Sequence, residues 1–235
     1  MSLGIGYGRF AAAVNSLLMG LALCLAAALI SQAEAQTVPA SSAIKIVVLG
    51  DSLAAGLGVK PEQSFPARLE AGLKAEGRDV TIVNQGVSGD TTAGGLDRVD
   101  WLLGDKPDIV LLELGANDAL RGLDPALAER NLAAVIEKLK AAGVTVWLAG
   151  MMAPRNFGPE YVASFDGLYK RLSDKYQVPL YPFILDGVAQ DPALNQADGL
   201  HPNVKGAQII ADKLLPFAAQ NLDSYAQTVH RPARP

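Results

Sequence analysis

The alternation of apolar runs with helical patterns constrains the fold of this chain most. Short runs rich in apolar residues, many of them β-branched, recur at residues 44–49, 80–84, 109–114, 144–148 and 180–183. Between and after them, helical periodicity predicts helices at residues 65–76, 96–103, 126–142, 161–176 and 205–220. Strands that alternate with helices form a parallel sheet with helices on both faces. The sequence therefore predicts an α/β fold, a three-layer α/β/α sandwich.

Individual residues predict where parts of this fold lie. The run at residues 109–114 is apolar enough for the centre of the sheet. Pro182 interrupts the last run and favours an edge position, because proline cannot donate to a strand ladder. Trp101 and Trp147 both fall in elements that we expect to build the core.

The first 35 residues have the three-part pattern of a secretory signal peptide. Arg9 precedes an apolar stretch from about residue 10 to residue 30, and the small residues Ala33 and Ala35 precede the expected cut. The stretch is also nearly long enough to span a bilayer, so an uncleaved membrane anchor is the alternative. The pattern favours cleavage, and hence a periplasmic or secreted protein with no stable membrane span.

The rest of the chain is expected to form one domain over residues 43–224, after a leader at 36–42 and before a tail at 225–235. Cys24 is the one cysteine, and it lies inside the signal peptide, where Leu23 before it disfavours lipidation. A cleaved chain therefore has no cysteine nucleophile and no thiolate metal site. The net charge of −4, without a basic block, indicates no nucleic-acid partner.

Three polar, glycine-rich loops follow predicted strands, at residues 50–52, 86–90 and 115–118. In sheets of this kind, ligands bind beyond the carboxyl ends of the strands. Ser52 lies in the first loop, where a serine acts either as a nucleophile or as a helix N-cap. The sequence Gly50–Ala54 lacks the second glycine of the G-x-S-x-G elbow, which counts against an α/β-hydrolase fold.

His201 is one of two histidines, and the other, His230, lies outside the expected fold. Asp198 precedes His201 by three residues, and Gly199 permits a tight turn between them. A histidine base needs such a carboxylate, although Asp198 in a surface turn that caps the last helix is the alternative. A metal site is not expected, because further histidines and an H-E-x-x-H pattern are lacking.

Two further residues are candidates for stabilising a developing oxyanion. The Asn117 side chain follows the expected central strand and carries an amide donor, and Gly89 offers a backbone N–H in a loop that a substrate approaches closely. The alternative is that both are ordinary turn residues.

Taken together, residues 50–52, 84–89, 115–118 and 198–201 resemble the signature of the SGNH hydrolases, also called GDSL esterases. The similarity extends from about Ile44 to the final helix. The stretches at 87–92 and 113–122 are most similar to the branch of secreted bacterial arylesterases and multifunctional thioesterase I/lysophospholipase L1 enzymes. Ala116 stands where that branch commonly has glycine, a difference expected to affect the acyl groove and to leave the oxyanion hole intact.

The resemblance implies a flavodoxin-like parallel sheet of five strands in the order 2-1-3-4-5. It implies Ser52 as nucleophile, His201 as general base and Asp198 as the acid that orients the histidine. The Ser52 and Gly89 N–H groups and the Asn117 side chain would form the oxyanion hole, with Asp51 in a structural role. The resemblance implies that no metal or cofactor is required.

The expected activity is that of a serine esterase on small aryl or acyl esters, with acyl thioesters and lysophospholipids as further substrates. Apolar residues after the third and fourth strands are candidates for the acyl groove, with ordinary packing as the alternative: Leu120, Leu123, Met151, Met152, Pro154 and Phe157. A carbohydrate O-acetyl esterase and a non-catalytic periplasmic lipid-binding module are the rival functions.

Overall fold

The computed structural model describes residues 43–229. The predictions for the signal peptide and leader, for Cys24 and for His230 lie outside the described residues. Within the described part, no helix combines the length and the apolarity that crossing a membrane requires.

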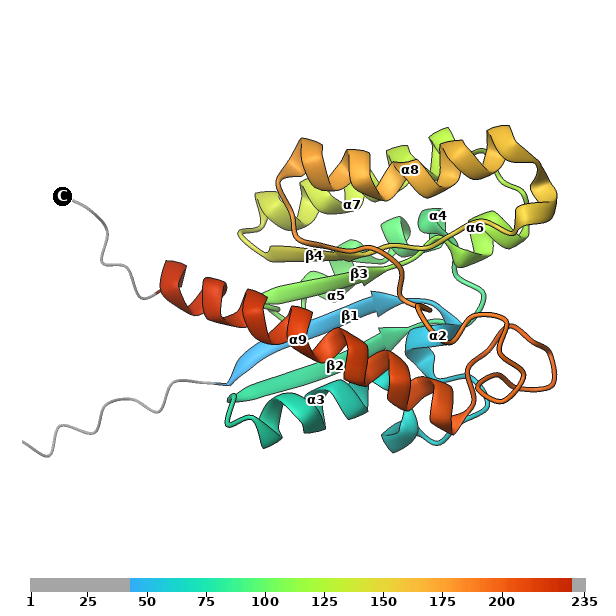
Figure 1. Cartoon of the computed structure of the whole chain (residues 1–235). Coiled ribbons are helices and arrows are strands. Elements are labelled where there is room, and N and C mark those ends of the chain that lie inside the picture. The colour runs from blue at the N-terminus through green and yellow to red at the C-terminus, as the bar shows by residue number, and fades with distance from the viewer. Residues whose placement is uncertain (1–42, 230–235) are drawn as a thin grey trace, which may run out of the picture. The chain divides into compact units, whose positions relative to one another are not determined.

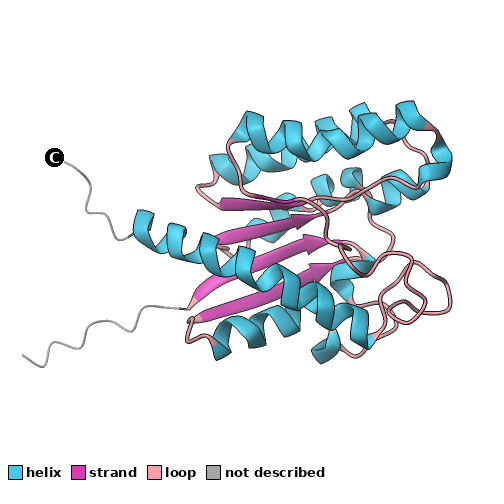
Figure 2. Ribbon diagram, in the orientation of Figure 1, coloured by secondary structure: helices cyan, strands magenta, loops and turns pink. Residues whose placement is uncertain are grey.

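A parallel sheet forms the middle layer of this unit (Figures 1 and 2). Its strand order is β2-β1-β3-β4-β5, and each neighbouring pair is parallel. The strands are β1 (Ile44–Gly50), β2 (Val80–Gly86), β3 (Ile109–Glu113), β4 (Thr145–Ala149) and β5 (Leu180–Tyr181). The predicted fold class and strand order are therefore confirmed.

The burial of the strands follows from their sequences. Every residue of β3 is buried, as expected of an apolar central strand covered on both faces. The edge strand β5 is only two residues long and ends directly before Pro182. Trp147 on β4 is among the largest fully buried side chains, in agreement with its predicted place in the core.

The longer helices form two packed groups around the sheet. Helix α3 (Phe65–Ala75) packs against α9 (Val204–Val229), and α7 (Pro125–Ala141) packs against α8 (Pro159–Tyr176) and the shorter α4 (Thr92–Asp97) and α5 (Val99–Leu103). In Figure 1, α9 crosses the near face of the sheet, and α4 and α5 lie behind it.

Helix α7 shows how the local sequence defines such a helix. The Asp124 side chain accepts a hydrogen bond from the backbone of Ala126 and so caps the helix, and Pro125 occupies its first position. Its buried residues recur at helical spacing and face the core: Ala128, Leu132, Val135, Ile136 and Leu139.

Short helices occupy the loops at the carboxyl ends of the strands. Helix α2 (Ser52–Ala55) follows β1 and α6 (Ala116–Leu120) follows β3, while the 3₁₀ helices η1 (Pro61–Gln63) and η2 (Arg155–Phe157) lie in longer loops. None of the four was predicted as a separate element, because each is too short to show a hydrophobic period.

The structure corrects one prediction about the core. The segment 96–103 is not a single helix but the end of α4 and all of α5, with Arg98 between them. Trp101 is 70% exposed, so its predicted place in the core is wrong. Its neighbours Val99 and Leu102 are the residues of α5 that are buried instead.

Helix α9 extends beyond its expected end at residue 220. It continues to Val229, so residues 225–229, which we expected in the tail, are helical. Leu222 is buried, and the Tyr225 hydroxyl donates to Asp108 Oδ1 at 3.3 Å. These contacts explain why the helix continues.

Candidate active site

Ser52 is the first residue of α2 and follows a tight turn at the end of β1. It directly follows Asp51, whose Oδ1 accepts a hydrogen bond from the Leu53 N–H at 2.9 Å and caps α2. Gly50 ends β1 in a position with no room for a side chain, since a Cβ there would lie 2.5 Å from the Glu113 carboxyl oxygen. The glycine thus allows the strand to turn closely into the helix that carries Ser52.

His201 reaches Ser52 from a loop far away in the sequence. The backbone of this loop is fixed by the bonds from Gln196 N to His201 O and from Asn203 N to Leu194 O, both 2.8 Å long. His201 Nε2 lies 2.9 Å from Ser52 Oγ. This is the distance at which an imidazole accepts the hydroxyl proton.

Asp198 holds the other side of the His201 ring. Asp198 Oδ2 lies 2.7 Å from His201 Nδ1, and Oδ1 accepts hydrogen bonds from the N–H groups of Leu200 and His201. The backbone bond from His201, and then its side-chain bond, hold the pKa of Asp198 well below its ordinary value. Asp198 therefore stays a carboxylate and favours the tautomer that carries a proton on Nδ1 and accepts one on Nε2.

Gly89 lies in a turn that directly follows β2, at the carboxyl end of the sheet. The Asp90 N–H donates to Val87 O at 3.1 Å and closes the turn, and Gly89 has a φ of +86°, which favours glycine. Arg121 Nη2 donates to the Gly89 carbonyl at 2.8 Å. The conformation of Gly89, and with it the direction of its N–H, is fixed from both sides.

Asn117 on α6 lies between the neighbours of the other two predicted oxyanion donors. Its Nδ2 is 3.2 Å from Oδ2 of Asp51, which precedes Ser52, and 2.9 Å from the carbonyl of Asp90, which follows Gly89. Asn117 therefore links the residues that adjoin Ser52 and Gly89 in the sequence, and it lines the same cavity as Ser52 and His201.

Two buried carboxyl groups, Asp51 and Glu113, lie at the turn Gly50–Ser52, which we call the nucleophile turn. Burial raises the pKa of Asp51 to about 6. Burial and then the nearby Asp51 raise the pKa of Glu113, at the end of β3, well above its ordinary value. Asp51 bonds to Leu53 and Asn117, and it is Asp198 that bonds to the histidine ring.

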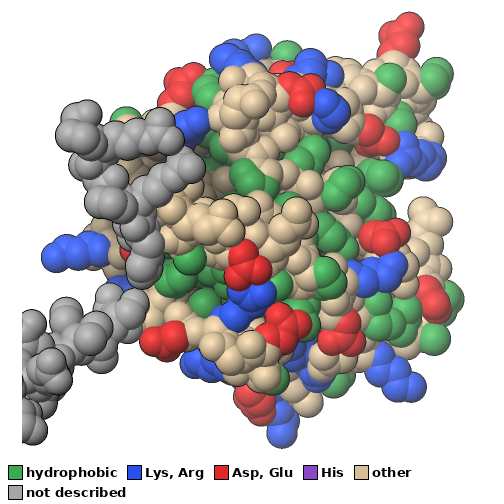
Figure 3. Space-filling view, turned by 60° about the vertical axis from the view of Figure 1, so that its left-hand side comes forward, with side chains coloured by type: hydrophobic (Ala, Val, Ile, Leu, Met, Phe, Trp, Pro, Cys, Tyr) green, Lys and Arg blue, Asp and Glu red, His purple; other side chains and the backbone are tan. Residues whose placement is uncertain are grey.

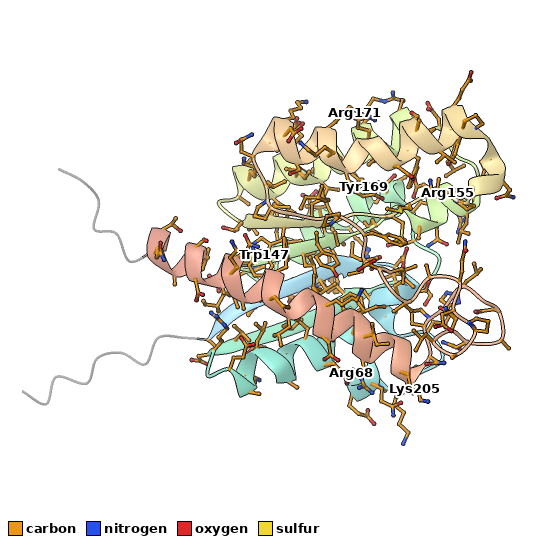
Figure 4. All side chains as sticks on the ribbon, in the orientation of Figure 1. Arg68, Trp147, Arg155, Tyr169, Arg171 and Lys205 are labelled. Atoms are coloured by element: carbon orange, nitrogen blue, oxygen red, sulfur yellow. The ribbon has the colours of Figure 1, made fainter. Side chains whose placement is uncertain are left out.

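A cavity of about 580 Å³ opens beside Ser52 and His201. It is lined mainly by apolar side chains and includes four of the residues predicted for an acyl groove: Leu120, Met151, Met152 and Pro154. In Figure 4, Arg155, which also lines the cavity, lies at the same end of the sheet, beyond the strands. Ala116, the residue that differs from the branch pattern, lines the cavity as well.

Leu123 and Phe157 were predicted in the same groove but are not among its lining residues. The Phe157 ring lies 5.1 Å from the ring of Tyr161, and the Tyr161 hydroxyl donates to the Leu123 carbonyl at 2.9 Å. The contacts of these two residues anchor loops, which was the alternative reading of them.

The sequence did not reveal several other lining residues. Phe183, Leu185 and Gln190 come from the loop after β5, and nothing in their local pattern predicts that this loop folds back over the site. Leu200 lines the cavity too, and its position next to His201 is a signal that could have indicated it. Among residues 43–229, no three histidine, cysteine or carboxylate side chains group as they would to hold a metal ion.

Comparison with known proteins agrees with this geometry. The family model of the GDSL-like Lipase/Acylhydrolase family matches residues 48–209. The chain is 42% identical over 179 residues to an arylesterase of Vibrio mimicus, an alignment that covers 76% of this chain and 88% of the relative. It is 37% identical over 177 residues to thioesterase 1/protease 1/lysophospholipase L1 of Escherichia coli K12, with coverage of 75% and 84%.

A solved structure shows the same similarity in three dimensions. The crystal structure of TesA superposes with a TM-score of 0.70 at 40% sequence identity, and the match covers 73% of this chain and 96% of that one. The resemblance inferred from the sequence signature is thereby confirmed.

Proposed function

The chain belongs to the GDSL-like Lipase/Acylhydrolase family, and we propose that it hydrolyses carboxylic esters through an acyl-enzyme formed on Ser52. The observation that carries this proposal is the continuous contact from Ser52 through His201 to Asp198, with distances of 2.9 Å and 2.7 Å. A serine, a histidine and a carboxylate in this order are the parts of a serine hydrolase.

His201 acts as general base in the first step. Its Nε2 takes the proton of Ser52 Oγ as this oxygen attacks the carbonyl carbon, and Asp198 stabilises the imidazolium that results. The imidazolium then gives the proton to the leaving group. Water hydrolyses the acyl-serine in the second step, again with His201 as base.

The tetrahedral intermediate places a negative charge on the former carbonyl oxygen. The Ser52 N–H, the Gly89 N–H and the Asn117 amide are the donors that we assign to it. Both hydrogens of the Asn117 amide are in use in the free site, so donation to the oxyanion replaces the longer bond, to Asp51 Oδ2 at 3.2 Å. In other hydrolases, the loss of one such donor costs roughly 3 kcal/mol of transition-state stabilisation.

The cavity beside Ser52 suits an acyl chain. Its volume of about 580 Å³ lies in the range of small-molecule pockets, and its lining is mainly apolar. The names of the relatives include arylesterase, thioesterase and lysophospholipase, and we propose the same substrate classes: aryl and acyl esters, acyl thioesters and lysophospholipids.

The two rival functions fit the site less well. A sugar-binding site uses aromatic platforms, whereas Phe183 is the one phenylalanine, tyrosine or tryptophan among the residues that line this cavity. The exposed Trp101 is not one of them. A non-catalytic lipid-binding module would not need Asp198 and Ser52 bonded to the same histidine ring.

Hydrolysis of p-nitrophenyl esters with acyl chains from acetyl to dodecanoyl tests the proposal. Each methylene that enters the cavity contributes about 0.8 kcal/mol, which is roughly a fourfold rise in kcat/KM until the cavity is full. We therefore expect a maximum at a medium chain length, and no turnover of any ester by Ser52→Ala.

Two results would contradict this proposal in different ways. Equal kcat/KM for acetyl and longer esters would remove the cavity from acyl recognition but leave the esterase. Activity that persists in Ser52→Ala would remove Ser52 as the nucleophile.

We also propose that the protein is exported and that residues 1–35 are removed. The support is the charged, apolar and small-residue order of that segment. Intact mass measurement of the protein from the periplasmic fraction of an expressing bacterium should give a chain that starts at Gln36. Full-length protein in the membrane fraction would instead favour an anchor.

A further inference from the structure

Arg98, between α4 and α5, binds three oxygens at the carboxyl ends of the strands. Its Nε donates to Asp90 Oδ2 at 2.7 Å, its Nη1 to the Gln85 carbonyl at 2.7 Å and its Nη2 to the Gly50 carbonyl at 2.8 Å. The side chains of Arg98 and Asp90 are each only 16% exposed. Each of the three nitrogens of the guanidinium group therefore donates a hydrogen bond, and the group is largely shielded from solvent.

The three acceptors belong to different parts of the site. Gly50 ends β1 and begins the nucleophile turn, Gln85 lies near the end of β2, and Asp90 ends the turn Val87–Asp90, which we call the oxyanion loop. The Val87 N–H also donates to the Gly50 carbonyl, at 3.1 Å. The oxyanion loop is thus attached to the end of β1 at its first residue directly and at its last residue through Arg98.

Asp90 links this arrangement to two of the oxyanion donors that we assign. Gly89 directly precedes it, so the direction of the Gly89 N–H depends on where Asp90 is held. The Asp90 carbonyl accepts the bond from Asn117 Nδ2 at 2.9 Å. A shift of Asp90 would therefore move both donors away from Ser52.

We propose that Arg98 is a positioning residue that assembles the oxyanion hole before substrate binds. This role rests on the proposed esterase function, and Arg98 itself touches no reacting atom. A planar guanidinium group can donate in three directions at once, whereas a lysine ammonium at the same place has a single nitrogen on a flexible stem. Small displacements of groups that contact the transition state reduce turnover strongly.

Comparison of Arg98→Lys with the matched control Arg171→Lys tests the inference. Arg171, labelled in Figure 4, bonds to Glu129 and joins α8 to α7 away from the cavity. For Arg98→Lys we expect kcat to fall about 10- to 100-fold while KM changes less than about threefold, because the donors act on the transition state. Arg171→Lys should keep the kcat of the unaltered chain.

A second readout separates positioning from a purely structural role. A p-nitrophenyl alkylphosphonate forms a tetrahedral adduct with an active serine, and its oxygen occupies the oxyanion hole. Its rate of reaction with Ser52 should fall in Arg98→Lys by about the same factor as kcat. Thermal unfolding of the same samples shows that the protein measured is folded.

Variants of Asp90 keep the inference testable if Arg98→Lys does not fold. Asp90→Asn retains an oxygen that can accept from Arg98 Nε, so its loss of kcat should be smaller than that of Asp90→Ala. The kcat of the double variant Asp90→Ala/Arg98→Lys should be about equal to that of the slower single variant, because both changes remove the same contact between Arg98 and Asp90.

Unchanged kcat and phosphonate reaction in folded Arg98→Lys, or full additivity with Asp90→Ala, would overturn the inference and leave the proposed function intact. The absence of Ser52-dependent hydrolysis in the unaltered chain would instead overturn the proposed function, and this inference with it.

Discussion

Glu113 is a fully buried carboxyl group at the end of β3, close to the buried carboxyl group of Asp51. Burial, and then the neighbouring Asp51, raise its pKa well above the ordinary value of 4.5. Burial also raises the pKa of Asp51 from 3.8 to about 6. The folded protein therefore binds protons at both groups more tightly than the unfolded chain does.

This pair predicts how stability depends on pH. A carboxyl group with a raised pKa favours folding below its unfolded pKa, and this contribution is lost as the pH rises through the folded value. For Asp51 the pH window runs from about 4 to about 6, and for Glu113 it begins near 4.5 and extends well above that pH. As the pH rises from 4.5 to 8, the unfolding free energy of the unaltered chain should therefore fall relative to that of Glu113→Gln. The fall should be about 1.4 kcal/mol for each unit by which the folded pKa of Glu113 exceeds its unfolded pKa.

Urea unfolding at pH 4.5, 6 and 8 measures this difference. Glu62→Gln changes an exposed carboxylate in η1 and is the control, for which no such trend is expected. Parallel stability profiles for the unaltered chain and Glu113→Gln would show that Glu113 does not titrate differently in the two states.

At the scale of elements, the sequence predicted best what burial alone determines. The apolar run of β3 and the buried stripe of α7 are patterns of the chain itself, and both elements form within one or two residues of their expected bounds. Ser52, Asn117 and the segment 198–201 could be located for a related reason. Ser52 and Asn117 each follow a predicted strand, and the segment 198–201 contains the turn residue Gly199. Serine, asparagine, aspartate and histidine at such positions carry out only a few kinds of chemistry.

What the sequence missed depends on contacts between elements. Trp101 is apolar, but α5 is a separate short helix that begins after Arg98 and buries Val99 and Leu102 instead, so the indole is exposed. Phe157 is close in sequence to Met152 but packs on Tyr161, outside the cavity. Arg98 itself carried no signal, because two of its three acceptors are backbone carbonyls that only the folded chain brings together.

At the scale of the whole described unit, the candidate active site and the contacts that hold the end of α9 lie at opposite ends of the sheet. The triad and the cavity lie at the carboxyl ends of the strands. At the amino end, Asp108 precedes β3 and accepts hydrogen bonds from the Lys45 N–H and the Tyr225 hydroxyl, so that it joins β1, β3 and the last turns of α9. On the face shown in Figure 3, side chains of both charges are intermixed with apolar ones.

This separation predicts that stability at the amino end of the sheet can be reduced without a change in catalysis. Leu222 on α9 is 3% exposed and belongs to the buried core. Leu222→Ala should lower the free energy of unfolding by about 2–4 kcal/mol, because a buried leucine leaves a cavity when it is truncated. Its kcat and KM on p-nitrophenyl esters, measured well below the melting temperature, should equal those of the unaltered chain.

The exposed Gln220 on the same helix provides the control, since Gln220→Ala removes no buried atoms and should change stability by less than about 0.5 kcal/mol. A fall in kcat for folded Leu222→Ala, beyond the fraction of unfolded protein, would show that α9 transmits strain to His201. The helix begins three residues after His201, at Val204, so this route exists in the chain. We expect no such transmission, because hydrogen bonds within the 194–203 loop, among them Asn203 N to Leu194 O, hold the backbone on both sides of His201.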